Sequence, residues 1–151
     1  MTTANNKDLV KQFYDALATS DVDAFLAIQH EDVAYNVHGR TPVSGRFTGK
    51  AFLVETVMPQ VFDNLQMETF NFSKKWKIMC ADENSVVAFM EADGLAKNGE
   101  RYNQFYCHLF EFREDKIAAV WEFFDSALAQ RALFNNPLTK DEPSPVSPFD
   151  F

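Results

Sequence analysis

The sequence predicts one α+β domain, with helices first and a four-stranded antiparallel sheet after them. Apolar residues recur at helical spacing up to about residue 66, and beyond it the period changes to two. The connections between the later segments are only two or three residues long, which is typical of antiparallel hairpins. A chain of 151 residues also has the usual size of a single domain. This order of elements is that of an α+β fold.

The first half of the chain predicts helices around one short strand. Residues 5–18 carry apolar side chains three and four positions apart, and a second helix opens at Ser20 or Asp21 after a short break. Residues 32–37 predict a short strand. The segment HGRTPVSGRFTG then predicts an irregular, turn-rich loop, because glycine and proline punctuate it.

A third helix is expected before the sheet. Thr48 is placed to cap it, and apolar residues continue at helical spacing as far as Phe62. Pro59 lacks a backbone N–H, so we expect it to kink or split this helix.

Four long strands make up the second half. They cover residues 67–80, 85–96, 100–113 and 116–125, and their connections are DEN (82–84), KNG (97–99) and ED (114–115). Ser126 is expected to cap a last short helix. We therefore place the domain in residues 1–134. Residues 135–151 hold four of the six prolines and predict an irregular or extended tail, with Phe149 and Phe151 able to pin its end to something apolar.

Both faces of the predicted sheet are apolar. On the third long strand the even-numbered residues from Tyr102 to Phe112 point one way, and Phe105 and Leu109 point the other. On the last strand Trp121 and Phe123 point away from Glu122. The helices can cover one face, and a second copy of the chain is the economical cover for the other, which predicts a homodimer through Phe105, Leu109, Trp121 and Phe123. The alternative is that the Pro-rich tail covers this face within a monomer.

Composition excludes several classes of protein. The net charge of −8 and a pI near 4.8 argue against nucleic-acid and membrane-surface partners, since both are anionic. No apolar run approaches the roughly 20 residues that span a bilayer, and no secretory signal is visible, so we expect a cytoplasmic protein. His30, His38 and His108 show no metal-ligand spacing, so no metal and no cofactor is expected.

Four polar residues in apolar strand segments are the candidate catalytic residues. Glu91 and Asp93 share a parity with Phe89, His108 lies between Tyr106 and Phe110, and Glu122 lies between Val120 and Phe124. Unpaired buried charge is costly, so such residues need a reason to be there. If these faces line one cavity, desolvation and mutual repulsion raise the carboxyl pKa values toward those that general acid catalysis near neutral pH requires.

Each of these residues also has a structural interpretation. Glu122 can pair with a basic residue at the sheet rim, Glu91 can be a cross-strand partner of Arg101, and Asp93 with Gly94 can form a bulge. His108 alone fits a hydrogen-bonded core histidine. Asp125 is equally well explained as a helix cap. The hypothesis of a catalytic site therefore depends on all four candidate residues lining one cavity, and not on any one of them alone.

The segments HGRTPVSGRFTGK and RYNQFYCHLFEFREDKIAAVWEFFDSALAQRAL, in this order of elements, resemble the SnoaL-like proteins of the ketosteroid isomerase and nuclear-transport-factor-two superfamily. The resemblance covers roughly residues 6–134. It implies a cone-shaped fold, in which a strongly curved sheet of four long strands and a short one wraps around three helices, encloses an apolar pocket, and dimerises through its outer face.

The resemblance also implies roles for individual residues. It places Asn36 at the position of the ketosteroid isomerase base, His108 at that of the donor Asp, and Phe13, with Tyr14 beside it, at that of the donor Tyr. None of those catalytic residues is retained, so steroid isomerisation by that mechanism is not expected. The Arg of the epoxide hydrolases is missing from the pair at Glu91 and Asp93. Glu122 matches the proton-transferring Glu of the phenazine-biosynthesis type.

Two hypotheses from different classes follow. The first is a cofactor-independent acid–base enzyme for a small hydrophobic molecule, of isomerase, cyclase, dehydratase or hydrolase type. Its catalytic residues are Glu122, His108, Asp93 and Glu91, and its substrate-binding residues are Tyr14, Asn36, Phe89, Tyr106 and Phe124. The second is a module of the same fold that only binds a ligand or forms a dimer.

Overall fold

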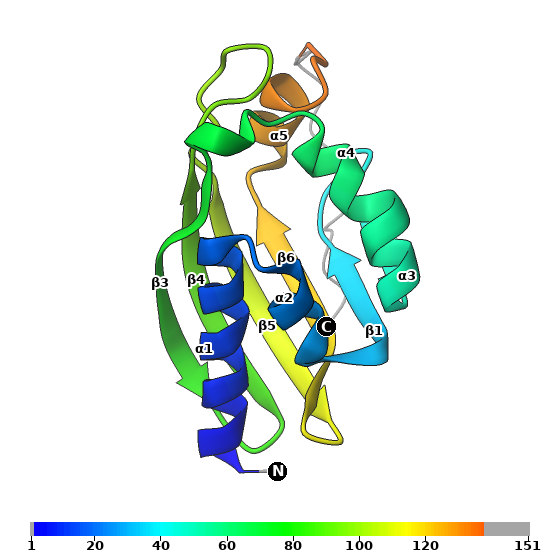
Figure 1. The fold of residues 1–151 in the computed structure, drawn as a ribbon, viewed down its shortest axis with the longest axis vertical. Coiled ribbons are helices and arrows are strands. Elements are labelled where there is room, and N and C mark those ends of the chain that lie inside the picture. Colours follow the sequence, from blue (N-terminus) through cyan, green and yellow to red (C-terminus); the bar gives the residue numbers. More distant parts are fainter. Residues whose placement is uncertain (1, 138–151) are drawn as a thin grey trace, which may run out of the picture.

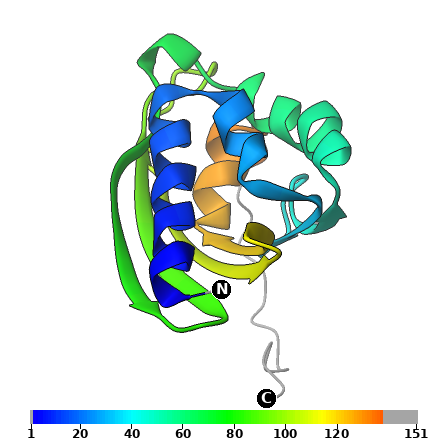
Figure 2. The ribbon, with the colours of Figure 1, turned by 60° about the horizontal axis from the view of Figure 1, so that its bottom comes forward.

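A strongly curved sheet of six strands wraps around the N-terminal helix in the computed structural model, which describes residues 2–137 (Figures 1 and 2). The strands are β1 (Gln29–Val37), β2 (Gly45–Thr48), β3 (Asn71–Ala81), β4 (Ser85–Asp93), β5 (Phe105–Arg113) and β6 (Lys116–Phe124). Their order across the sheet is β2-β1-β6-β5-β4-β3. The predicted α+β class, with a curved sheet on N-terminal helices, is confirmed.

The helices lie on the concave side of this sheet and at its ends. They are α1 (Thr3–Thr19), α2 (Val22–Ala27), α3 (Lys50–Phe52), α4 (Met58–Phe62) and α5 (Ser126–Ala132), with a π-helical turn η1 (Leu53–Val57) and a 3₁₀ turn η2 (Met67–Thr69). Helix α1 packs on β3 and β4, while α3 packs beside β1 (Figure 1). No helix among residues 2–137 is long and apolar enough to cross a bilayer.

The sheet is mixed rather than purely antiparallel, which corrects the prediction. Strand β1 runs parallel to β6 and antiparallel to β2, and β2 lies in the segment that we expected to be an irregular loop. The four residues of β2 alternate too briefly to be recognised locally. They pair with Ala34–Val37 because positive φ angles at Gly39 and Gly45 turn the chain back.

The third helix begins at Lys50 with Gly49 as its N-cap, and Thr48 ends β2 instead of capping the helix. Pro59 divides this helix as expected, because its missing N–H leaves the carbonyl of Glu55 without an α-helical donor, and η1 comes directly before α4. The last helix is capped by the Asp125 side chain, which accepts from the N–H groups of Ala127 (2.9 Å) and Leu128 (3.1 Å), so the prediction for Ser126 is wrong.

Two predicted strands are shorter than expected. Residues 67–69 form η2, and β3 begins at Asn71. Strand β4 ends at Asp93 and β5 begins at Phe105, but irregular antiparallel pairing continues beyond both strands to the predicted KNG turn. A bridge between Leu95 and Arg101 flanks this turn, where the Ala96 N–H donates to the Glu100 carbonyl at 2.9 Å. A second bridge, between Leu65 and Ala96, joins this hairpin to the segment that follows α4.

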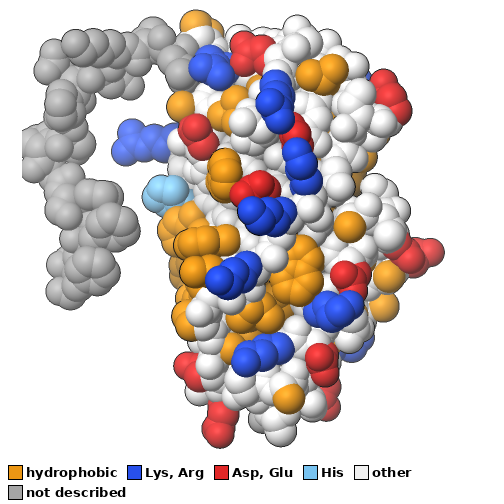
Figure 3. Space-filling model, turned by 90° about the vertical axis from the view of Figure 1, so that its left-hand side faces the viewer, with side chains coloured by type: hydrophobic (Ala, Val, Ile, Leu, Met, Phe, Trp, Pro, Cys, Tyr) orange, Lys and Arg blue, Asp and Glu red, His pale blue; other side chains and the backbone are white. Residues whose placement is uncertain are grey.

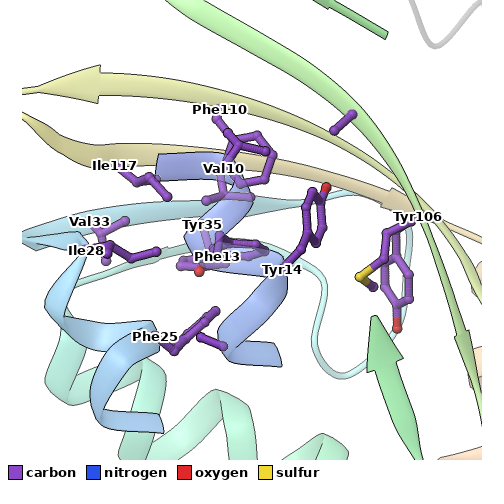
Figure 4. Close-up of a cluster of buried hydrophobic side chains, with 14 of the residues drawn as sticks. Val10, Phe13, Tyr14, Phe25, Ile28, Val33, Tyr35, Tyr106, Phe110 and Ile117 are labelled. Carbon is purple, nitrogen blue, oxygen red and sulfur yellow. The ribbon is translucent and has the colours of Figure 1, made fainter. Parts of the chain in front are cut away.

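An aromatic core fills the space between α1, α2 and the sheet. Phe13 lies edge-on to Phe110 with ring centroids 5.0 Å apart, and it also contacts Phe25 at 5.0 Å (Figure 4). Phe110, Val10 and Ile117 are fully buried (Figure 4). The helical spacing of α1 produces this packing directly, because Val10, Phe13 and Tyr14 occupy one face of the helix.

The outer sheet face carries the side chains that the sequence assigned to it. Phe105 is 63% exposed, Trp121 and Phe123 are each 40% exposed, and Leu109 is half-buried. The homodimer through these residues stays a prediction. The alternative cover, the Pro-rich tail, lies largely outside the described residues, as do Phe149 and Phe151.

Candidate active site

An apolar pocket lies between the curved sheet and the helices, with a volume of about 690 Å³ including its open mouth. Residues from α1, α2, β1, η1, α4 and four strands of the sheet surround it. Its lining consists of Phe13, Leu17, Phe25, Tyr35, Val37, Val43, Leu53, Val57, Met58, Val61, Phe62, Phe72, Met90, Tyr106, His108 and Glu122. Glu122 carries the one carboxylate among these lining residues, so we expect acid–base chemistry in this pocket to involve Glu122.

Glu122 belongs to a chain of hydrogen bonds that runs from the pocket into the core. Its Oε2 atom lies 3.0 Å from Nε2 of His108, and Nδ1 of His108 lies 2.9 Å from the hydroxyl oxygen of Tyr14. The sheet aligns the first pair, because His108 and Glu122 face each other directly across β5 and β6. The second contact comes from α1, which packs on the inner face of the sheet and places the Tyr14 hydroxyl against His108.

The Glu122 carboxylate decides the direction of these bonds, because it can only accept, so Nε2–H of His108 donates to it. In the tautomer with its proton on Nε2, Nδ1 is an acceptor, and the Tyr14 hydroxyl donates to it. Burial, and then the nearby charge of Glu122, raise the pKa of Tyr14 far above its ordinary value, so its phenol keeps the proton that it donates. The structure therefore joins Tyr14, His108 and Glu122 in one ordered relay.

Aromatic rings hold the relay in place. Trp76 stacks on Tyr14 with centroids 5.0 Å apart, and Tyr106 stacks on His108 at 5.5 Å with an interplanar angle of 15°. His108 itself is 1% exposed. Because packing fixes both rings of the relay, His108 has little freedom to leave Glu122, and the site is preorganised.

A second polar network begins at Tyr106. Its hydroxyl lies 3.3 Å from that of Tyr102, and the Gln104 side chain donates to the Tyr102 oxygen (3.5 Å) and to the Asp125 carbonyl (2.9 Å). Phe124 packs against Tyr106 with ring centroids 6.0 Å apart. Tyr106 therefore lines the pocket as predicted. Phe124, which was also predicted to bind substrate, is not among the lining residues and packs against the Tyr106 ring instead.

The prediction that Phe89, Glu91 and Asp93 face the pocket is wrong. In β4 the buried residues are Val86, Ala88, Met90 and Ala92, whereas Phe89 is 49% exposed. The register places Phe89 opposite Cys107 and Glu91 opposite Phe105, both on the outer face. The even-numbered residues of β4 are all apolar and lie under α1, whereas the odd-numbered ones include Ser85, Glu91 and Asp93 and face outward.

The outer side of β3 and β4 is a charged surface over apolar side chains. Figure 3 looks onto the side of the molecule where β3 lies and shows Lys and Arg side chains among hydrophobic ones. Asp93 bonds here to Lys74 (2.7 Å) and to Arg101 (2.9 Å), and these hydrogen bonds lower its pKa well below the ordinary value. Asp93 is thus a surface ion-pair residue, and Arg101 pairs with it rather than with Glu91.

Asn36 also lies outside the pocket, which corrects its prediction as a substrate-binding residue. It stands opposite Trp121 in the register, and its Oδ1 accepts a hydrogen bond from Arg46 at 3.0 Å. Its neighbours Tyr35 and Val37 face inward instead and line the pocket. Sequence reasoning missed both, although they share one parity of the strand. Their place near Glu122 follows from the parallel register with β6, in which Val37 pairs with Glu122.

The remaining predicted residues are brought together. Glu122, His108 and Tyr106 line one pocket, whereas Tyr14, predicted to bind substrate, is not among its lining residues and contacts His108 instead. The Arg or Lys partner considered for Glu122 is not found among residues 2–137, where its side chain is hydrogen-bonded to His108. Nor do the described residues contain a cluster of three or more His, Cys, Asp or Glu able to hold a metal ion.

The four tyrosines of the chain provide a pH prediction. Burial raises the pKa of Tyr14, Tyr35 and Tyr106 well above the ordinary value and that of Tyr102 to about 12. The unfolded chain loses its phenol protons near pH 10, so above about pH 10 it binds fewer protons than the folded chain. Folding stability is therefore expected to be retained below about pH 10 and to fall as the pH rises above it.

Phenolate absorbance measures this directly. The native protein is expected to show almost no phenolate at a pH near 10.5, whereas the protein in denaturant titrates around pH 10. Urea unfolding across the same range should show the loss of stability. A native protein that titrates together with the denatured one would contradict the burial of these phenols.

Comparison with known proteins gives one family and many similar structures. The family model of the SnoaL-like domain matches residues 10–120. A protein from Xanthomonas campestris with a cystatin-like fold is 24% identical, with a TM-score of 0.71 over 91% of this chain and 100% of the other. No curated protein matches.

Two further structures carry functional names. A proposed isomerase from Bacillus subtilis is 18% identical, with a TM-score of 0.71 over 91% of this chain and 97% of the other. A proposed polyketide cyclase from Xanthomonas campestris pv. campestris is 20% identical, with a TM-score of 0.69 over 87% and 98% of the two chains. At these identities the likeness establishes the fold, and activity has to be argued from the pocket.

Proposed function

The chain belongs to the SnoaL-like domain family, and from this premise we propose that it is a cofactor-independent enzyme that moves a proton within a small hydrophobic molecule. One observation supports this above all: a carboxylate lines an otherwise apolar and aromatic pocket and is hydrogen-bonded to a buried imidazole. Structures with the same fold include a proposed isomerase and a proposed polyketide cyclase, and both names fit proton-transfer chemistry.

Glu122 is the general base of the proposed reaction. Its Oε1 atom accepts no hydrogen bond from the described residues, while Oε2 is engaged by His108. A C–H proton next to a substrate carbonyl passes to Oε1, and the electron pair of that bond moves onto the carbonyl oxygen to give an enolate. The protonated Glu122 then returns the proton to another atom of the same molecule. Protons and electrons balance without a cofactor.

His108 and Tyr14 act as positioning residues. The Nε2–H of His108 holds the carboxylate in one orientation, and the Tyr14 hydroxyl fixes the tautomer that makes this donation possible. The apolar walls exclude water and thereby strengthen each of these interactions. Tyr106 and Tyr35 bring their rings to the pocket, and Tyr35 is held by a 2.8 Å hydrogen bond to Gln29.

Hydrogen–deuterium exchange tests this proposal before the natural substrate is known. A panel of apolar ketones with acidic α-protons, such as 2-tetralone and phenylacetone, is incubated with the protein in D₂O. NMR then follows the loss of the α-proton signals. We expect the folded protein to accelerate exchange of at least one ketone above the buffer rate at the same pH. Exchange at the buffer rate across the panel would contradict the proposal.

The same pocket also suits the alternative function of a binding module without catalysis. The relay can hold a ligand hydroxyl as well as move a proton, because a carboxylate accepts hydrogen bonds strongly. Ketones that bind in calorimetry yet do not exchange would favour this alternative.

A further inference from the structure

A second cavity adjoins the pocket and has no assigned role. Its volume is about 610 Å³ including its opening, and it lies between the α1–α2 turn, α4 and η2. We call it the annex. Five of its lining residues, Leu17, Phe25, Met58, Phe62 and Phe72, also line the pocket that contains Glu122. A single layer of side chains therefore separates the two spaces.

This dividing wall is entirely apolar and partly adaptable. Phe62 and Phe72 pack together with ring centroids 5.1 Å apart, and Phe25 lies on the far side of the core cluster from Phe110 in Figure 4. Met58, Phe62 and Leu17 are only half-buried. Unbranched methionine side chains change rotamer at little cost, so the wall can open without movement of the backbone.

The annex opens to solvent past two exposed apolar side chains. Val22 is 39% exposed and Met67 is 37% exposed, and both line it. Its polar lining residues are Ser20 and Asp21. The Asp21 carboxylate is already occupied as the cap of α2, where it accepts from the N–H of Ala24 at 2.9 Å. Eight of its ten lining residues are apolar, so the annex is suited to hydrocarbon, and its one charged residue, Asp21, is exposed to solvent.

We infer that the annex is a subsite for the apolar chain of an elongated substrate whose oxygen-bearing end reaches Glu122. This inference rests on the proposed function for the position of the polar end. Such a substrate crosses the wall at Phe62 and Met58 and places its hydrocarbon between Val22 and Met67. The annex then selects substrates by the length of their hydrocarbon chain rather than by their polar groups.

Binding of 4-alkylphenols from ethyl to heptyl tests the inference by calorimetry. The phenol hydroxyl can donate to Glu122 while the alkyl chain points toward the wall. Each methylene that enters the annex is expected to tighten binding about fourfold. In Met67→Trp and in Val22→Trp, indole rings fill the annex from two different elements. We expect both variants to bind 4-heptylphenol about tenfold or more weakly than the wild type and 4-ethylphenol within about twofold of it.

Met79→Trp is the matched control. Met79 is 48% exposed on β3 and lines neither cavity, so its replacement should leave the whole series unchanged. The inference is overturned if affinity stops rising at short chains in the wild type, or if both annex variants bind 4-heptylphenol as the control does. Failure of the proposed function looks different, because ketone exchange would stay at the buffer rate while the dependence of binding on chain length persisted.

Discussion

Glu122→Gln is expected to lower the rate of ketone hydrogen–deuterium exchange by about 10²–10⁴-fold. A carboxamide has nearly the same shape as the carboxylate but cannot take up a proton near neutral pH. The Nε2–H of His108 can still donate to the amide oxygen, so the relay and the fold should persist. Exchange is measured by NMR with the most responsive ketone, and thermal unfolding verifies that the variant is folded.

Glu91→Gln is the matched control for this variant. Glu91 lies on β4, two strands from β6 in the sheet, and faces outward opposite Phe105, so its replacement should leave the exchange rate unchanged. Equal rates in the wild type and Glu122→Gln would remove Glu122 from the mechanism. A loss of rate in Glu91→Gln, with Glu122→Gln unaffected, would mean that Glu91 rather than Glu122 is the catalytic carboxylate.

Phe110→Ala is expected to destabilise the fold by about 3–5 kcal/mol. Phe110 is fully buried on β5, with ring centroids 5.0 Å from Phe13, 6.0 Å from Tyr14 and 5.7 Å from His108. Truncation leaves a cavity at the centre of the aromatic core. The loss is a large part of the 5–15 kcal/mol typical of a domain. Urea unfolding monitored by circular dichroism measures it.

Phe89→Ala serves as the comparison on the other face of the sheet. Phe89 is 49% exposed, so its truncation should cost less than about 1 kcal/mol. The two variants remove the same side chain from adjacent strands and differ in the face that they affect. Similar losses in both would mean that the outer face is as tightly covered as the core.

The contrast between β4 and β5 shows how well the apolar alternation of the sequence was used to predict the buried face of each strand. On β5 one parity carries Tyr106, His108 and Phe110, and the structure buries these residues as predicted. On β4 the even-numbered residues from Val86 to Ala92 are all apolar and are buried against α1, but the prediction followed Phe89 on the other face. The pairing of Glu91 and Asp93 with the site failed for this reason.

Strand β1 shows a second limit. Its existence was predicted, but its parallel pairing with β6 joins residues more than eighty positions apart in the chain. The alternation of Val33, Tyr35 and Val37 with polar or small residues already marks one face of β1 as apolar, and Tyr35 and Val37 of this face line the pocket. Local spacing does not contain the partner strand, and it is the pairing with β6 that brings Val37 beside Glu122.

By itself, the sequence determined the α+β class, the inward placement of His108 and Glu122, and the helix that carries Tyr14, because these follow from periodicities within single segments. The three-dimensional packing established that β1 pairs with β6, that Tyr14 meets His108, and that two cavities share one wall. The physical reason is that a period of two or 3.6 shows which side chains share a face. It does not show which distant part of the chain packs against that face.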